Sequence, residues 1–235
     1  MRFPSRLLAS TMVHASMLWA GFLAVVAVIV LGIAVFGRVT ASAWEKAAVL
    51  PRWYVLFVGI ALIREFLPLY VAHGQTRRRF GVHAAVTVTL LAPFLSALLV
   101  VGYLIETGVY SLAGWEQALD RTHLFGEPTQ LHLVFLEYAL EFLVWLAGGA
   151  FIGAAYYRWE AGGLLIGIPV GAGLILLTQA MIGADFGLPV VGRILESNPP
   201  GSLALAVAVG LASFVTCLAL TWSTIRDIPL RNNIG

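Results

Sequence analysis

The feature of this sequence that most constrains its fold is a series of long apolar runs with almost no charge. Each run reaches about 20 residues, the length that a helix needs to cross a hydrocarbon core of roughly 30 Å. In lipid every backbone N–H and C=O needs a partner within the protein, so only helices and closed β-barrels span a bilayer. The runs are too long for barrel strands and lack their alternation. The sequence therefore predicts an all-α fold, a polytopic membrane helical bundle.

The composition agrees with a chain that lies almost entirely in the membrane. Hydrophobic residues make up 60% of the 235 residues and charged residues 11%, against about 45–50% and about 25% in soluble proteins, and the mean hydropathy is +0.91. About six spans use up the chain, so we expect 1–235 to form a single transmembrane domain. The net charge of +2 predicts no nucleic-acid partner. The lone Cys217 cannot form an internal disulfide.

We expect six transmembrane helices between an N-terminal segment at 1–14 and a tail at 223–235. The spans are placed at 15–36, 53–72, 82–105, 131–157, 162–182 and 203–222. The tripeptide Ala41-Ser42-Ala43 imitates a signal-peptidase site, but the preceding apolar run is about twice as long as a signal h-region, so we interpret it as an uncleaved first span.

The charges outside the spans divide unequally between the two sides of this arrangement. One side carries mainly arginines: Arg2, Arg6, Arg77, Arg78, Arg79, Arg158, Arg226 and Arg231. The other side carries seven acidic residues: Glu45, Glu106, Glu116, Asp120, Glu127, Asp185 and Glu196, with Arg38, Lys46, Arg52, Arg121 and Arg193 among them. The positive-inside rule puts both termini in the cytoplasm, which predicts a multi-pass protein of the cytoplasmic membrane.

Two segments outside the spans are open to interpretation. Residues 2–16 mix apolar and basic side chains, which is typical of a short helix lying in the membrane interface and equally of a disordered basic tail. Residues 183–202 are unusually apolar for a connection and are compatible with a re-entrant segment in the outer leaflet.

Rows of glycine occur in the fourth and fifth predicted spans. Gly149 and Gly153 lie four residues apart in one span, and Gly163, Gly167 and Gly171 repeat the spacing in the next. Small residues at this spacing let helix backbones approach closely. We therefore expect both spans to pack tightly against their neighbours, rather than to handle a substrate with these residues.

Four ionisable residues are predicted to lie at membrane depth: Arg64, Glu65, Glu137 and Glu141. A charge at the centre of a membrane helix costs about 2.5–3.5 kcal/mol, so such groups are normally paired or functional. Counting from the outer ends of the spans places Arg64 roughly 16 Å deep and Glu141 roughly 15 Å deep. We expect an Arg64–Glu141 ion pair that stabilises the bundle. Glu137, one turn away, would share the arginine or a proton.

Several classes of enzyme are disfavoured. The only lysine, Lys46, follows Glu45, so the chain has no Gly-x-x-x-x-Gly-Lys-Ser/Thr phosphate loop and cannot hydrolyse ATP by that route. The five histidines divide between the two ends, and His132 with Glu137 lacks a metal-site motif. Ser213 lacks a neighbouring base and the Gly-x-Ser-x-Gly context. We predict no catalytic residue, no metal site and no cofactor bound to this chain.

One stretch carries a resemblance to a known family. Residues 66–80 read FLPLYVAHGQTRRRF, in which an apolar-Pro-Leu segment leads into Gly-x-Thr-Arg-Arg-x-Phe. This resembles the end of the second span and the following cytoplasmic loop of ABC-2-type transporter permeases. The tight turn at 157–162, with Arg158 and Gly162, is similar to their turn between spans four and five. The likeness covers the whole chain in its layout but only about fifteen residues in motif.

The resemblance implies a permease subunit of an ATP-binding-cassette exporter. Its partners would be a separate ATPase subunit, which binds ATP and Mg²⁺, a second permease copy or homologue in a dimer, and the lipid bilayer. The ATPase-coupling loop, which contributes a short coupling helix that docks on the ATPase, would consist of Gly74, Gln75, Thr76, Arg77, Arg78, Arg79 and Phe80. In this interpretation Gly74 ends one helix and Thr76 caps the next. The positive-inside rule alone is the competing explanation for the arginines.

Two departures leave the substrate class undecided. Arg226 is followed by Asp227 where a more basic end is expected, and the connection at 107–130 has no matching feature. A different class of protein, an ATP-independent carrier or channel, would instead use Arg64, Glu65, Glu137 and Glu141. The lack of a convincing internal repeat counts mildly against such a carrier.

Overall fold

The computed structural model describes residues 3–182 and 202–227, and the fold within these ranges is helical. The helices are α1 (Phe3–Phe36), α2 (Ala43–Ala47), α3 (Val49–Arg64), α4 (Phe66–Ala72), α5 (Arg77–Ala113), α6 (Leu131–Trp159), α7 (Ala161–Ile182) and α9 (Leu203–Ile225). Six segments of the described chain are long and apolar enough to cross a membrane: α1 from Thr11, α2 to α4 taken together, α5, α6, α7 and α9. The predicted all-α membrane bundle is confirmed.

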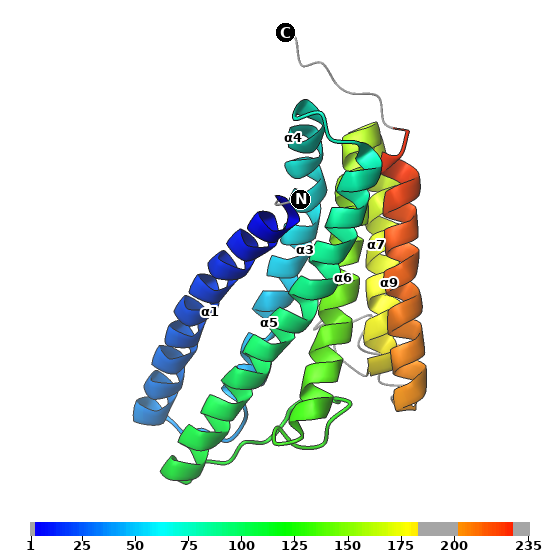
Figure 1. Ribbon diagram of the computed structural model, residues 1–235. Coiled ribbons are helices and arrows are strands. Elements are labelled where there is room, and N and C mark those ends of the chain that lie inside the picture. Colours follow the sequence, from blue (N-terminus) through cyan, green and yellow to red (C-terminus); the bar gives the residue numbers. More distant parts are fainter. Residues whose placement is uncertain (1–2, 183–201, 228–235) are drawn as a thin grey trace.

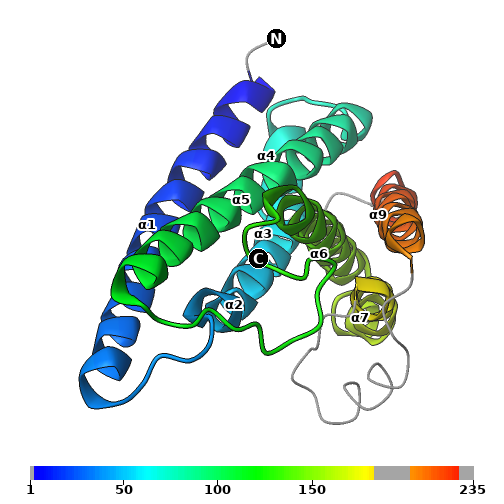
Figure 2. The same cartoon turned by 90° about the horizontal axis from the view of Figure 1, so that it is seen from below.

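The helices run up and down the bundle and alternate in direction (Figure 1). We call the end with the 73–76 turn the inner end, and the end with the 114–130 connection the outer end. Helix α6 occupies the centre, between α3 and α5 on one side and α7 and α9 on the other (Figure 2). Its buried residues extend from Val134 to Ala155. Helix α1 lies at the edge and exposes large apolar side chains such as Val28 and Val35, as a lipid-facing helix does.

The second span is interrupted twice, which the hydropathy pattern does not reveal. It begins at Ala43 and continues as α2, α3 and α4 to Ala72. The break at Glu65 lies next to the carbonyl of Arg64, which cannot receive a helical hydrogen bond from Pro68 because proline has no N–H. The span starts at Ala43, ten residues before the predicted Trp53. This earlier start places Arg52 inside the bundle, where it is buried.

Residues 3–16 continue α1 without a break, so neither a separate interfacial helix nor a disordered tail describes them correctly. Pro4 is compatible with this because it lies in the first turn, where a missing N–H costs nothing. The predicted re-entrant segment at 183–202 lies outside the described residues except for Ser202. The Ser202 hydroxyl accepts a hydrogen bond from the Leu205 N–H and caps α9.

The glycine rows lie at the closest helix contacts. A Cβ atom at Gly149 would collide with the backbone of Leu56 in α3, and one at Gly153 would lie 2.7 Å from the Ile60 carbonyl oxygen. On α7, Gly167 and Gly171 lie against Ile152 of α6, and Gly163 contacts the backbone of Ala155. Helix α6 is thus packed closely against both α3 and α7 through glycine contacts. A side chain of α6 that points toward either helix therefore lies in the interior of the bundle.

Candidate functional site

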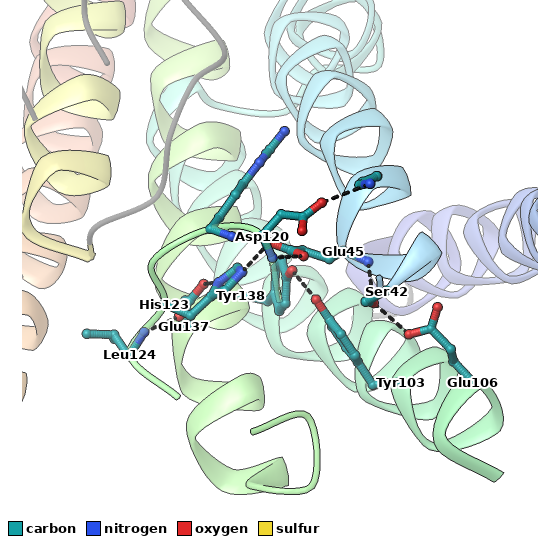
Figure 3. A network of polar contacts seen from close by, with 11 residues as sticks. Ser42, Glu45, Tyr103, Glu106, Asp120, His123, Leu124, Glu137 and Tyr138 are labelled. Atoms are coloured by element: carbon teal, nitrogen blue, oxygen red, sulfur yellow. Dashed lines mark hydrogen bonds and ion pairs between the residues drawn. The ribbon is translucent and has the colours of Figure 1, made fainter. Parts of the chain in front are cut away.

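A polar network occupies the outer part of the bundle, where α2, α3, α5, α6 and the 114–130 connection meet, and Figure 3 draws the part of it around His123 and Glu106. Its first part is an ion pair between Arg52 of α3 and Glu141 of α6, with Nε and Oε2 2.9 Å apart. Both side chains are buried, with 5% and 0% of their surface exposed. The second oxygen of Glu141, Oε1, has no hydrogen-bond partner among the described residues. Arg52 therefore neutralises Glu141 and leaves it with spare hydrogen-bonding capacity.

The predicted Arg64–Glu141 pair is wrong. Arg64 lies near the inner end, where its side chain is 58% exposed, and its nearest carboxylate is that of Glu65 at 3.9 Å. Its guanidinium also lies over the ring of Tyr156, 5.6 Å from the centroid. The four predicted intramembrane charges are thus divided. Glu137 and Glu141 are buried, whereas Arg64 and Glu65 face outward.

The second part of the network is a histidine held between two carboxylates. His123 comes from the 114–130 connection, and its Nδ1 lies 2.6 Å from Glu137 Oε1 while its Nε2 lies 3.1 Å from Glu45 Oε1. The His123 side chain is 1% exposed, and its ring stacks on Phe125 with centroids 4.4 Å apart. A neutral imidazole has one N–H, so only the imidazolium form can donate to both carboxylates.

The protonated form of His123 is favoured by its surroundings. Burial by itself lowers the pKa of the ring, but hydrogen bonds and charge attraction from Glu137 and Glu45 outweigh burial and raise the pKa of His123 from 6.5 to about 9. At neutral pH the imidazolium therefore stands between two carboxylates. Together with Arg52 it sets two buried positive charges against the four buried glutamates of this region, Glu45, Glu106, Glu137 and Glu141.

The same carboxylates hold the backbone of the connection. Glu45 accepts hydrogen bonds from the N–H groups of Asp120 and Arg121, each at 2.9 Å, and Glu137 accepts one from the Leu124 N–H at 2.7 Å. Buried backbone donors outside helices need such acceptors. Residues 120–124 are thus fastened to α2 and α6 at several points.

Glu106 of α5 makes an equivalent attachment next to this site. It accepts hydrogen bonds from the Ser42 hydroxyl at 2.6 Å, the Trp44 N–H at 2.8 Å and the Gln117 amide at 2.7 Å. Deeper in the bundle the hydroxyls of Tyr103 and Tyr138 lie 3.0 Å apart (Figure 3). The described residues hold no group of three His, Cys, Asp or Glu side chains arranged for a metal ion. The network is chemically an ion-pair and hydrogen-bond clamp that fastens the 114–130 connection to α2, α5 and α6.

A second candidate site lies at the inner end, in the turn between α4 and α5. Gly74 adopts φ 72° and closes a Schellman motif, in which the Gly74 N–H bonds to the Val71 carbonyl and the Gln75 N–H to the Tyr70 carbonyl, both at 2.9 Å. Thr76 then caps α5 by accepting a hydrogen bond from the Arg79 N–H at 3.2 Å. The sequence motif therefore encodes a defined turn.

The residues of this turn have different environments. Arg78 and Arg79 are exposed, Arg77 is half-buried, and no carboxylate among the described residues pairs with any of the three. Phe80 is 1% exposed and packs on Tyr70 with centroids 5.2 Å apart. The expected separate coupling helix does not form, because Arg77–Phe80 is the first turn of α5. Phe80 cannot contact a partner and supports the arginines from inside.

The second motif of the resemblance also forms a tight turn at the inner end. Helix α6 stops at Glu160, which has φ 53°, and α7 starts at Ala161. The Arg158 guanidinium donates to the Thr224 carbonyl of α9 at 2.9 Å. This arginine therefore joins two helices within the chain.

The fold defines a multi-pass α-helical membrane protein with two distinct polar regions at opposite ends. Comparisons with known protein families, with curated proteins and with solved structures gave no match. The functional conclusion therefore rests on the geometry of the two regions.

Proposed function

We propose that this chain is the membrane-spanning permease subunit of an ATP-binding-cassette exporter in the cytoplasmic membrane. A separate ATPase subunit would bind ATP and Mg²⁺ and dock at the inner end, and a second permease copy or homologue would complete the dimer. The observation that carries the proposal is the turn at 74–79, whose three arginines pair with no carboxylate among the described residues and lie above the buried aromatic ring of Phe80.

The packing beneath this turn suits the transmission of force. Phe80 belongs to a small core that joins four other helices through Ile63 of α3, Tyr70 of α4, Ala154 of α6 and Ile225 of α9. Because packed cores are nearly incompressible, a displacement of the turn moves these helix ends with it. Exposed arginines are suited to bind acidic residues of a partner through charge-assisted hydrogen bonds. The combination supports a docking element coupled to the spans.

Affinity purification of the full chain in mild detergent tests this proposal. The expected result is recovery of an ATPase subunit with the wild-type chain and its loss when Arg77, Arg78 and Arg79 are replaced by glutamate. Arg38→Glu, an exposed arginine at the outer end, is the matched control and should retain the ATPase. A chain that purifies alone and moves solute into liposomes without ATP contradicts the proposal.

A second candidate function, an ATP-independent carrier, is favoured by two unsatisfied groups in the bundle. Among the described residues, neither Glu141 Oε1 nor the two polar side-chain atoms of Gln179 has a hydrogen-bond partner, and all three atoms are buried. Buried polar groups of this kind are often part of substrate or ion paths. Solute uptake by proteoliposomes that is lost with Glu141→Gln, without any ATPase, would support this alternative.

A further inference from the structure

Two adjoining cavities lie along α1 on the side that faces the bundle. The middle cavity, of about 200 Å³, is lined by apolar side chains of α1, α3 and α5, among them Trp19, Phe22 and Tyr54. The outer cavity, of about 360 Å³, continues toward the outer end. Phe22 and Leu50 line both cavities, so the two form a single slot beside α1.

The chemistry of the slot changes along its length. The middle part presents almost only hydrocarbon and aromatic surface, whereas the outer part adds Arg38, Thr40, Ser42 and Lys46. The Lys46 ammonium already pairs with Asp120 at 2.8 Å. Arg38 is exposed and has no carboxylate partner in the described part of the chain. The outer mouth thus offers a free guanidinium above an apolar slot.

We propose that this slot binds one amphipathic lipid from the membrane, with its anionic headgroup at Arg38 and a hydrocarbon chain along Phe22 and Trp19. Charge complementarity selects the headgroup, because basic side chains at membrane-facing pockets bind anionic lipid headgroups. The apolar part matches a hydrocarbon chain, which gains about 0.8 kcal/mol for each CH₂ that it buries.

Native mass spectrometry of the full chain in mild detergent tests the site. After delipidation, the protein is titrated with phosphatidylglycerol and phosphatidylcholine that carry the same acyl chains. The wild type should retain one phosphatidylglycerol with a preference of about fivefold over phosphatidylcholine, as expected from one arginine near a headgroup. Arg38→Gln should abolish the preference. Arg64→Gln, an exposed arginine at the inner end, should leave it unchanged.

Matched substitutions on α1 test the slot itself. Ala15 lines the middle cavity and is buried, whereas Ala20 of the same helix is exposed and lies outside both cavities. Ala15→Phe should remove retention of the lipid, and Ala20→Phe should not. Leu50→Trp places a larger side chain at an exposed position that lines both parts of the slot, and it should also weaken retention. This variant provides the test if Ala15→Phe does not fold.

Three results overturn the lipid site: equal retention of both lipids by the wild type, an unchanged preference in Arg38→Gln, or equal effects of Ala15→Phe and Ala20→Phe. Binding of a second protein copy in place of the lipid overturns it as well. The assay contains no ATPase, so failure of the permease proposal leaves its outcome unaffected. If the lipid binds but no ATPase co-purifies with the chain, the lipid site is supported and the permease proposal is contradicted.

Discussion

Arg52 and Glu141 form an ion pair between α3 and α6 that is almost completely removed from solvent. Breaking a buried pair leaves an uncompensated charge and costs about 3–5 kcal/mol, whereas replacing both partners with apolar residues is often nearly neutral. We predict that Arg52→Met strongly reduces the thermal stability of the detergent-solubilised protein, and that Arg52→Met/Glu141→Leu restores most of it. Size-exclusion chromatography after heating measures both.

Arg64→Met is the control for this experiment. It removes an arginine from the adjacent inner part of the same helix, but its side chain is 58% exposed and no buried carboxylate depends on it. Its effect should stay within about 0.5 kcal/mol, as for ordinary surface changes. Equal losses in the single and double variants would show that Arg52 and Glu141 do not compensate each other.

The clamp around His123 predicts a dependence of stability on pH. The pKa of His123 is raised to about 9 in the folded protein, above its ordinary value of 6.5. A group whose pKa is raised on folding contributes all of its stabilisation below the unfolded pKa and loses it as the pH rises through the folded pKa. A difference of this size corresponds to about 3 kcal/mol. The protein should therefore lose stability between about pH 6.5 and 9.

The comparison of His123→Gln with His132→Gln isolates this effect. His132 belongs to the same outer region but is exposed, and no buried carboxylate bonds to it in the described part of the chain. Melting temperatures measured from pH 6 to 9.5 should decline for the wild type and for His132→Gln and remain nearly flat for His123→Gln. The same decline in all three proteins would assign the pH dependence to other groups.

The sequence was sufficient to predict the six membrane-spanning segments, because each apolar run has the length and low charge that a bilayer requires. It was not sufficient to find the partner of Glu141. Hydropathy placed the start of the second span at Trp53, yet the helix begins at Ala43, so Arg52 lies inside and Arg64 lies near the inner end. The direction in which Arg64 points depends on tertiary packing, which hydropathy does not report.

The clamp was missed for a related reason. Glu45 and His123 are 78 residues apart in the chain, and both lie in segments that the sequence assigned to polar connections. A partial signal existed, since Glu137 and Glu141 sit in an apolar run where buried carboxylates need cationic partners. The helix end at Gly74 and the helix cap at Thr76 could be predicted from the sequence, because helix ends and caps depend on the residues next to them in the chain.

The close approach of α3 and α6 predicts a large effect of a single methyl group. A Cβ atom at Gly149 collides with the Leu56 backbone, which cannot move aside as a flexible side chain would. Gly149→Ala should therefore destabilise the bundle by about 1–3 kcal/mol, as overpacking does. Gly173→Ala is the control, since nothing lies within 4 Å of its added Cβ, and it should be neutral or slightly stabilising. Thermal unfolding of both variants in detergent provides the measurement.

The position of Phe80 predicts that a single substitution can impair the transmission of movement to the helices without preventing the ATPase from binding. If the proposed function is correct, the exposed arginines bind the ATPase while the buried Phe80 ring passes the movement to Tyr70 and the helices around it. Phe80→Ala keeps the arginines but leaves a cavity beneath them, which loosens the turn and costs about 3–5 kcal/mol of stability. We expect the ATPase still to co-purify with this variant, while ATP hydrolysis loses its response to substrate. Phe80→Leu fills most of the volume and should restore part of that response. Loss of ATPase binding in a folded Phe80→Ala protein would instead show that docking itself depends on the packing beneath the arginines.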